Sequence, residues 1–300
     1  MNCMGCAVKV RICGDLKNDK VNSENKLILS NRVTEVSTIM AGIGVFPLFT
    51  SDLPAKEKYQ LIKNTGFDAV NIYWGDEDKY EQAKVAKELG LVIDNIHTQN
   101  DDANSLWQDT IDGDERLNTL LSSVEDCALY DIPTAVIHLT GYPPYLPVSE
   151  LGLARIGKIV SLAEQKNIKL AFENLWTFEH LDILFERFSS PNVGFCYDCG
   201  HENLNLYRDC LTSYGDRLLA LHINDNFADG YDAHVLPFDG TIHWEEKMRR
   251  LNQYKIVDFL TLEIYKIDFG EHKKSLIYNK LSAESFLNLA YEKAVKLLEI

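Results

Sequence analysis

The chain lacks any apolar run of the ~20 residues that a membrane-spanning helix needs. Polar residues interrupt its N-terminal stretch at once, so we expect no secretory signal there. It also lacks the cysteine pattern of a disulfide scaffold, because its 7 cysteines are an odd number on 300 residues. These absences favour a cytoplasmic protein with reduced thiols and no membrane partner.

Positive charge is scarce as well. The sequence has 30 Lys and Arg against 45 Asp and Glu, which gives a formal net charge of −15. Binding to a nucleic-acid backbone draws on Lys and Arg, so this balance disfavours a nucleic-acid partner. A Gly-rich phosphate loop is missing too, since AGIGVF (41–46) matches the dinucleotide fingerprint poorly. We therefore do not predict a doubly wound sheet, and we expect Arg155 at the surface rather than on a phosphate.

From about residue 36 the sequence instead alternates short apolar runs with amphipathic helical segments. The eight apolar runs are VSTIMAG (36–42), FDAVNIYW (67–74), LVIDNIH (91–97), TAVIHLT (134–140), KLAFEN (169–174), VGFCYD (193–198), LLALHIN (218–224) and FLTLEIY (259–265). Continuous apolar runs of this length indicate strands that are covered on both faces. Eight strand–loop–helix units predict an α/β fold, a single (β/α)₈ barrel over residues 36–300, with its chemistry at the carboxyl ends of the strands.

Helix start and stop signals separate these strands. Asp52 and Pro54 predict the start of a helix, and Gly66 predicts its end. The segment 149–166 carries a helical stripe of apolar residues at positions 151, 153, 156, 159, 160 and 163.

Residues 1–35 are predicted to be an N-terminal extension outside the barrel. The runs VKVRIC (8–13) and KLILSN (26–31) can pair as a hairpin across a polar stretch. Cys3 and Cys6 form a CxxC pattern, but no second CxxC and no histidine stand nearby. We expect a frayed tail there rather than a metal or redox site.

Acidic and imidazole side chains stand at the ends of several predicted strands. Four of them, Glu173, Asp198, His222 and Glu263, would meet at one barrel mouth. The strand ends supply no Lys or Arg to pair with these carboxylates, which would repel one another without a cation. Mixed oxygen and nitrogen ligands suit Mn²⁺, Co²⁺, Zn²⁺ or Mg²⁺. The sequence therefore predicts a divalent metal held by these four residues.

Two histidines end the strands that come before Glu173. His97 and His138 either bind substrate or hold a second metal that Glu173 bridges. A single histidine at a strand end is often only a hydrogen-bonded residue. We accordingly expect at least one metal and leave room for more.

A further acidic and imidazole set follows strands six and seven. His201 stands three residues after Asp198, and Asp232-x-His234 lies in the long loop after strand seven. His201, Asp232 and His234 can form a third metal site, which would bring the total to three. The remaining histidines, His180, His243 and His272, are expected to be surface or structural residues.

Aromatic residues stand at or just beyond the predicted strand ends. They are Tyr73, Trp74, Trp107, Trp176 and Tyr265. Such rings either pack the top of the barrel or form a pocket wall on which the carbon face of a sugar stacks.

Taken together, these motifs resemble the xylose isomerase-like barrel superfamily over about residues 36–298. The resemblance rests on Glu173-Asn174, Tyr197-Asp198-x-x-His201, His222-Ile223-Asn224-Asp225, Asp232-x-His234-x-x-Pro237-x-x-Gly240-x-Ile242-x-Trp244 and Leu262-Glu263. That superfamily includes sugar-phosphate isomerases and epimerases, ketose 3-epimerases, inosose dehydratases and endonuclease IV.

The epimerase branch implies one divalent metal held by Glu173, Asp198, His222 and Glu263. The two glutamates would lie on opposite faces of a carbohydrate substrate, one taking a proton from carbon and the other returning it through an enediolate. His201 would contact a substrate oxygen. The loop arginine of ketose epimerases is absent, because Ala228 stands at that position.

The endonuclease IV branch implies three zinc ions and cleavage of abasic DNA, and all nine of its ligands have counterparts here. The loop after strand two, YWGDEDKYE, is acidic where a DNA-binding loop needs Lys or Arg. We therefore favour a metal-dependent sugar or sugar phosphate isomerase or epimerase. A zinc phosphodiesterase is the first alternative, and a non-isomerising sugar or cyclitol lyase or binding barrel is the second. The sequence leaves open the sugar, its phosphorylation and any homo-oligomer.

Overall fold

The computed structural model describes residues 40, 42–47, 53–205, 207–254, 257–266 and 278–300. They belong to one compact unit that runs from Thr38 to Ile300. The hairpin expected within residues 1–35 and the Cys3-x-x-Cys6 pattern lie outside the described residues.

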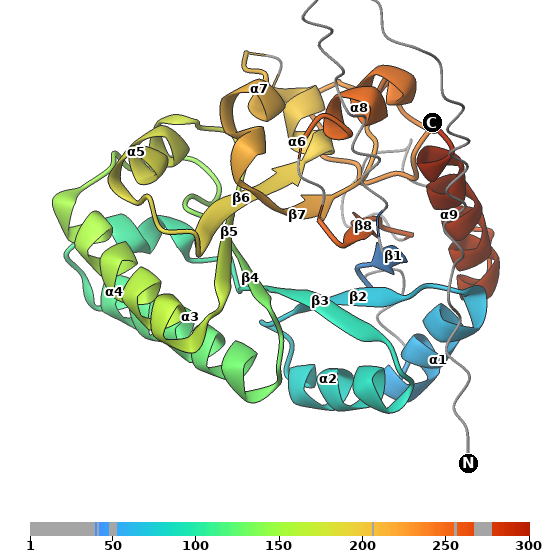
Figure 1. The fold of residues 1–300 in the computed structure, drawn as a ribbon, viewed down its shortest axis with the longest axis horizontal. Helices are drawn as coiled ribbons and strands as arrows, with labels where there is room; N and C mark the ends of the chain where they lie inside the picture. Colours follow the sequence, from blue (N-terminus) through green and yellow to red (C-terminus); the bar gives the residue numbers. More distant parts are fainter. Residues whose placement is uncertain (1–39, 41, 48–52, 206, 255–256, 267–277) are drawn as a thin grey trace, which may run out of the picture. The chain divides into compact units, whose positions relative to one another are not determined.

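Eight parallel strands form the inner wall of this unit, with the helices outside them (Figure 1). The strands are β1 (Gly42–Val45), β2 (Ala69–Tyr73), β3 (Val92–His97), β4 (Thr134–Ile137), β5 (Lys169–Glu173), β6 (Val193–Asp198), β7 (Leu218–His222) and β8 (Phe259–Leu262). Their order in the sheet is β7-β6-β5-β4-β3-β2-β1-β8. Each strand thus pairs with its neighbours in sequence, and β1 pairs with β8.

Backbone hydrogen bonds close the ring between β7 and β8. Ile223 N donates to Thr261 O at 2.9 Å, and Glu263 N donates to Ile223 O at 3.0 Å. This parallel bridge pairs Ile223 with Leu262, at the end where both strands finish. The predicted (β/α)₈ barrel is therefore confirmed, and its ring closes at the mouth where the chemistry was expected.

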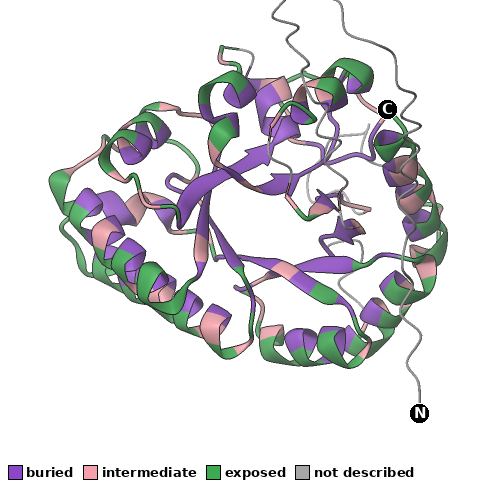
Figure 2. Ribbon diagram, in the orientation of Figure 1, coloured by how far each residue is buried: buried purple, intermediate pink, exposed green. Residues whose placement is uncertain are grey.

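Helices connect the strands and cover the outside of the ring. They are α1 (Ala55–Thr65), α2 (Lys79–Glu88), α3 (Ile111–Leu129), α4 (Glu150–Lys166), α5 (Glu179–Arg187), α6 (Cys199–Leu204), α7 (Cys210–Tyr214), α8 (Trp244–Leu251) and α9 (Ala283–Leu298), with the 3₁₀ turns η1 (Ala103–Trp107) and η2 (Gly215–Arg217). Figure 2 shows strands that are buried along almost their whole length and helices that are buried only on the side facing them. This one-sided burial is the reason for the amphipathic pattern of the helical segments.

The first strand was placed too early from the sequence. β1 begins at Gly42, where the run VSTIMAG ends, and residues 36–39 and 41 lie outside the described residues. The β-branched residues of that run suggested a strand, whereas packing selects the smaller sequence GIGV. A Cβ at Gly44 would lie 2.7 Å from Thr261 Oγ1, so the interior between β1 and β8 admits no side chain there.

Two helices show how local signals set the element ends. Gly66 ends α1 in the left-handed conformation, with φ of 114°, as predicted. The proposed cap Asp52 lies outside the described residues. Ser149 caps α4 by accepting a hydrogen bond from Gly152 N at 3.1 Å, and Asn167 ends this helix with φ of 57°.

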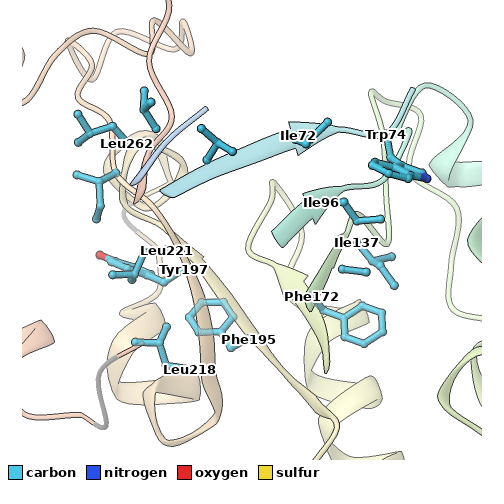
Figure 3. Close-up of a cluster of buried hydrophobic side chains, with 14 of the residues drawn as sticks. Ile72, Trp74, Ile96, Ile137, Phe172, Phe195, Tyr197, Leu218, Leu221 and Leu262 are labelled. Carbon is cyan, nitrogen blue, oxygen red and sulfur yellow. The ribbon is translucent and has the colours of Figure 1, made fainter. Parts of the chain in front are cut away.

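The apolar core lies mainly between the strands and the helices. Figure 3 shows Ile96, Ile137 and Phe172 following one another across β3, β4 and β5 on that outer side. A smaller cluster of short side chains, Val136, Ala171, Cys196 and Ala220, comes from the alternate positions of β4 to β7. Among the described residues, no helix is long and apolar enough to cross a membrane.

Candidate metal centre

The four predicted metal ligands meet at the carboxyl ends of four adjacent strands. Glu173, Asp198 and His222 are the last residues of β5, β6 and β7, and Glu263 directly follows β8. One donor atom from each lies within 4.8 Å of all the others, and all four side chains are buried. Residues up to 90 positions apart in the chain therefore form one compact donor set.

The spacing and chemistry of these donor atoms fit a cation. His222 Nδ1 lies 3.0 Å from Glu263 Oε2 and 3.2 Å from Glu173 Oε2. One imidazole proton cannot balance the three buried carboxylates of the set, and burying the remaining negative charge is costly unless a cation binds there. Three carboxylates with one imidazole suit a divalent ion.

Asp198 is held in place by neighbouring strands and by the helix it starts. Its Oδ1 accepts a hydrogen bond from His201 N at 2.6 Å, which caps α6. Its Oδ2 accepts from Asn224 Nδ2 at 2.9 Å. The amide of Asn174 holds the Asp198 backbone, with bonds of 2.8 Å to both its N and its O. The Asn174 and Asn224 positions of the sequence motifs thus orient this carboxylate.

Buried imidazoles control the charge of the two glutamates. Burial alone would raise the pKa of Glu173, but His222 and His138 hold it well below its usual range. Burial would likewise raise the pKa of Glu263, yet His222 and His234 lower it to about 2. Both glutamates are therefore carboxylates at neutral pH, as ligands or proton acceptors must be.

Asp198 and His222 complete this charge balance. Burial raises the pKa of Asp198 to about 7, against the attraction of His201. Burial lowers the pKa of His222, but Cys196, Glu263 and Glu173 together raise it well above its usual range. Without a cation the cluster is balanced by an imidazole proton, and a divalent ion would take over that role.

A second donor group lies beside the first. His138 Nε2 lies 2.9 Å from Glu173 Oε2 and 3.1 Å from His97 Nε2. His97 Nδ1 also faces Thr98 O at 2.9 Å. The structure thus brings His97 and His138 together with Glu173, as the sequence suggested, with donor atoms within 4.8 Å of one another.

A third donor group lies on the other side of Glu173. Asp232 Oδ2 lies 3.0 Å from both His201 Nε2 and His234 Nε2. His201 Nδ1 in turn lies 3.1 Å from Glu173 Oε1. The nine predicted ligand residues therefore form one continuous array around Glu173, although Asp232 is partly exposed.

Asp225 explains the motif that follows β7. Its Oδ2 accepts hydrogen bonds from Trp244 Nε1 at 2.9 Å and from Phe238 N at 3.2 Å. Its Oδ1 accepts from Ile242 N at 3.1 Å. A buried carboxylate with several donors is a rigid anchor, so the loop after β7 folds around this one side chain.

The same anchor positions the third donor group. A Cβ at Gly240 would overlap both Asn226 O and Asp225 Oδ1, so only glycine fits against the anchor. Backbone bonds of 2.8 and 2.9 Å between Asp225 and Val235 pin the segment that carries His234. The Pro237-x-x-Gly240-x-Ile242-x-Trp244 pattern therefore places His234 and its neighbour Asp232 over the barrel mouth.

Three of the five predicted aromatic residues line the cavity above the donor array. Each lies beside an imidazole, with ring centroids 5.9 Å apart for Tyr73 and His97, 5.8 Å for Trp176 and His201, and 4.3 Å for Tyr265 and His234. These rings thus form part of the cavity wall and restrict the histidines.

The other two aromatics, Trp74 and Trp107, do not line this cavity, so of the two alternatives the packing of the barrel top applies to them and the assignment to a substrate pocket does not. Trp74 follows Tyr73 in β2, and because side chains alternate along a strand it points outward, where Nε1 donates to Asp126 Oδ2 at 2.8 Å. Trp107 is buried in η1, and its Nε1 donates to Leu139 O at 2.6 Å. Both are core residues of the barrel top.

Arg155 is buried rather than at the surface, contrary to the sequence-based expectation. Its guanidinium donates to Leu106 O at 2.9 Å and to Asp114 Oδ1 at 2.7 Å, which ties η1 and α3 to α4. His180 is also buried outside the cavity, and its Nε2 faces Leu146 O at 2.9 Å. His243 is exposed, and His272 lies outside the described residues.

The cavity above the donor array has a volume of about 460 Å³. No Lys or Arg is found among the described residues that line it, whereas Asp76 and Asp101 add carboxylates to those of the donor array. Asn100 adds a polar side chain to the cavity wall. Its Nδ2 lies 3.4 Å from His138 Nδ1, and its Oδ1 accepts a hydrogen bond from Tyr73 Oη at 3.3 Å. A pocket of this size with convergent polar groups fits a small polyhydroxylated molecule.

Two asparagines of the site were missed in the sequence. Asn100 lies in an irregular loop and has no pattern that marks it. Asn71, which contacts His222, is a polar residue in the middle of the apolar run FDAVNIYW. A buried amide inside a strand needs partners, so this interruption was a usable signal.

The sequence model of one protein family, described as the xylose isomerase-like TIM barrel, matches residues 59–281. The chain belongs to this family. The matched segment contains all nine residues of the three donor groups. Uncharacterized protein y4fM of Sinorhizobium fredii is 42% identical over 89 residues. That match spans 27% of this chain and 28% of the relative, so it covers about a quarter of each.

Solved structures of this fold include several sugar epimerases. A D-tagatose 3-epimerase-like protein is 20% identical, with a TM-score of 0.61, over 84% of this chain and 99% of its own. An L-ribulose 3-epimerase is 16% identical, with a TM-score of 0.70, over 87% and 95%. A D-psicose 3-epimerase with D-tagatose, from Clostridium cellulolyticum H10, is 15% identical, with a TM-score of 0.69, over 86% and 100%. At these identities the likeness concerns the fold.

Proposed function

We propose that this chain is a divalent-metal-dependent isomerase or epimerase that acts on a carbohydrate. The observation that carries the proposal is that carboxylate oxygens of Glu173 and Glu263 both lie beside the same ring nitrogen of His222, at 3.2 and 3.0 Å from Nδ1. The acidic cavity, free of Lys and Arg among its described residues, suits a neutral polyhydroxylated substrate. The epimerases that share the fold support this choice of reaction.

In this reaction the two glutamates would exchange protons with one carbon of the substrate. Glu173 or Glu263, ionised at neutral pH, takes the proton from the carbon next to the carbonyl group. The other glutamate takes up a proton from solvent and donates it to the opposite face of that carbon, and the first glutamate then releases its proton to solvent. The low pKa of both carboxyl groups makes either of them a base at neutral pH. A divalent ion held by Glu173, Asp198, His222 and Glu263 would supply positive charge that favours the enediolate.

The test is a screen of free and phosphorylated ketoses after chelation and reloading with Mn²⁺, Co²⁺, Zn²⁺ or Mg²⁺. We expect turnover of a free sugar that disappears with chelation and returns with one of these ions. The Glu173→Gln protein should lose this turnover while remaining folded, as checked by circular dichroism. No turnover of any ketose by metal-loaded protein, or turnover that survives complete chelation, would reject the proposal.

A second function is favoured by one observation, the presence of three adjacent donor groups rather than one. A phosphodiesterase that binds three zinc ions and cleaves abasic DNA would use all nine donor residues. The cavity argues against it, since its described lining carries Asp76 and Asp101 and no cation for a phosphate backbone. Cleavage of a duplex with an abasic site by zinc-loaded protein would reverse our preference.

A further inference from the structure

The second nitrogen of the His222 ring faces an amide across the barrel interior. His222 Nε2 lies 3.3 Å from Asn71 Nδ2, and both side chains are fully buried. Asn71 belongs to β2 and His222 to β7, so the contact spans the barrel beneath the donor array. The opposite ring nitrogen, Nδ1, faces the carboxylates of Glu173 and Glu263. One imidazole thus connects the metal centre to a buried asparagine.

The orientation of this amide decides which nitrogen of His222 carries the proton. An amide nitrogen can only donate, so a contact through Asn71 Nδ2 requires a bare Nε2 and leaves the proton on Nδ1. That arrangement blocks Nδ1 as a metal ligand and leaves Asn71 Oδ1 buried without a partner among the described residues. The reverse orientation fills the same space and lets Oδ1 accept from Nε2–H.

The neighbouring strand favours the reverse orientation. Asn95 is the register partner of Asn71 in β3, so the two side chains lie on the same face of the sheet. Asn95 Oδ1 is also a buried acceptor without a partner in the described part of the chain. If Asn71 turns its oxygen toward His222, that oxygen gains a partner, and the Asn71 nitrogen becomes a free donor on the face where Asn95 Oδ1 lacks one.

We propose that Asn71 is a positioning residue that fixes His222 with its proton on Nε2 and thereby presents Nδ1 to a divalent metal. Metal-binding histidines usually donate their other N–H to such a partner, and losing the partner lowers metal affinity. The inference rests on the proposed metal centre but not on the identity of the sugar. It assigns a role to the polar residue that interrupts the apolar run of β2.

The experiment compares metal affinity in two variants that differ in whether position 71 keeps an acceptor oxygen. Asn71→Leu removes the acceptor, and Asn71→Asp keeps an acceptor oxygen at the same place. By isothermal titration with Zn²⁺ alone, we expect Asn71→Leu to bind roughly 10- to 100-fold more weakly than the wild type. Asn71→Asp should retain or exceed wild-type affinity. Equal affinities of wild type and Asn71→Leu, or an equal loss in both variants, would overturn the proposal.

Cys196→Ala is the matched control, because this thiol also lies close to the ring. Cys196 Sγ lies within 4.8 Å of donor atoms of both Glu173 and His222. We expect its zinc affinity to equal that of the wild type. A loss in Cys196→Ala without a loss in Asn71→Leu would transfer the role to the thiol and refute our assignment.

A direct measurement needs no variant of Asn71 and so does not depend on its folding. In ¹⁵N spectra of the zinc-loaded wild-type protein, His222, identified by its absence in His222→Gln, should carry its proton on Nε2 and its metal on Nδ1. Zinc on Nε2, or a wild-type protein that binds no zinc at His222, would contradict the inference. Since no sugar enters these measurements, a failed ketose screen would reject the proposed function alone.

Discussion

Asp94 offers the sharpest test of the electrostatics beneath the donor array. It lies in β3, where the register with β2 shifts, and its Oδ2 accepts hydrogen bonds from Thr261 Oγ1 at 3.1 Å and from Asn95 Nδ2 at 2.9 Å. Burial raises the pKa of Asp94 from 3.8 to about 6, despite these two bonds. A carboxyl group that resists ionisation in the fold lowers stability wherever the unfolded chain is ionised.

The size and sign of this effect follow from the two pKa values. The pKa of Asp94 is higher in the folded protein than in the unfolded chain. The contribution of Asp94 to the free energy of unfolding is therefore fully present below the unfolded pKa and is lost as pH rises through the folded pKa. A difference of about two pKa units corresponds to about 3 kcal/mol at alkaline pH. Roughly half of this is already lost at about pH 5, so about 1.5 kcal/mol separates about pH 5 from about pH 8.

Asp94→Asn removes the titration and keeps one acceptor oxygen for Thr261 and Asn95. We expect this variant to melt above the wild type at about pH 8, and the gap to shrink by roughly 3–6 °C at about pH 5. Asp216→Asn, at an exposed position in η2, is the control for replacing a surface carboxylate by an amide. The reasoning fails if the Asp94→Asn gap is the same at both pH values, or if this variant is the less stable one at about pH 8.

The remaining predictions concern the donor array and its supporting loop. Glu263→Gln should lower kcat on a confirmed sugar by about 10²- to 10⁴-fold, because it removes one proton carrier; full activity would defeat the two-glutamate mechanism. Gly240→Ala should destabilise the protein by about 1–3 kcal/mol in denaturant titrations through overlap with Asp225 and Asn226. Gly157→Ala, where a Cβ meets only ordinary contacts, should not. Elemental analysis of protein loaded with metal and dialysed should give about one ion per chain, whereas about three zinc ions would favour the phosphodiesterase. In thermal denaturation the loaded protein should melt at a higher temperature than the chelated protein.

Most of the barrel was visible in the sequence because covered strands are apolar along their whole length. Seven of the eight predicted runs contain the observed strand, from β2 to β8. The predicted ligand positions followed from the same pattern, since Glu173, Asp198 and His222 are polar residues at or near the ends of those runs and are the last residues of β5, β6 and β7. The carboxyl ends of all strands in a parallel barrel lie at the same mouth. Knowing where each strand ends was therefore enough to predict that these side chains come together.

The same apolar continuity hid which way each side chain points. Tyr73 ends β2 and Trp74 follows it, and both aromatic side chains can be buried, so residue type does not tell which one faces the interior. Asn71 shows which of the two aromatic residues faces the interior. It contacts His222, and Tyr73 lies on the same face of the strand because it is two positions further along. Trp74, on the alternate face, packs against helices instead.

Helix α4 shows a related limit of the helical stripe. Arg155 is adjacent to Ile156 in the buried stripe, but its charge suggested a solvent position. The carbonyl groups that accept its hydrogen bonds come from η1, more than 40 residues earlier in the chain. Leu151, which was counted in the predicted stripe, is 38% exposed, because the buried face of α4 starts at Gly152 and Leu153 instead. A buried cation of this kind depends on tertiary partners that the helix does not encode.

Charge explains why the number of ions discriminates between the proposed functions. The nine donor residues include four carboxylates, Glu173, Asp198, Asp232 and Glu263, with a combined charge of about −4 when ionised. One divalent ion leaves about −2, two bring the array near zero, and three leave about +2 in a buried site. Excess positive charge there requires an anionic ligand, as a phosphodiester provides and a neutral sugar does not. The four-residue set carries three of the carboxylates, so we expect the first ion at His222, beside Asn71, and a neutral substrate would supply no charge to hold a third.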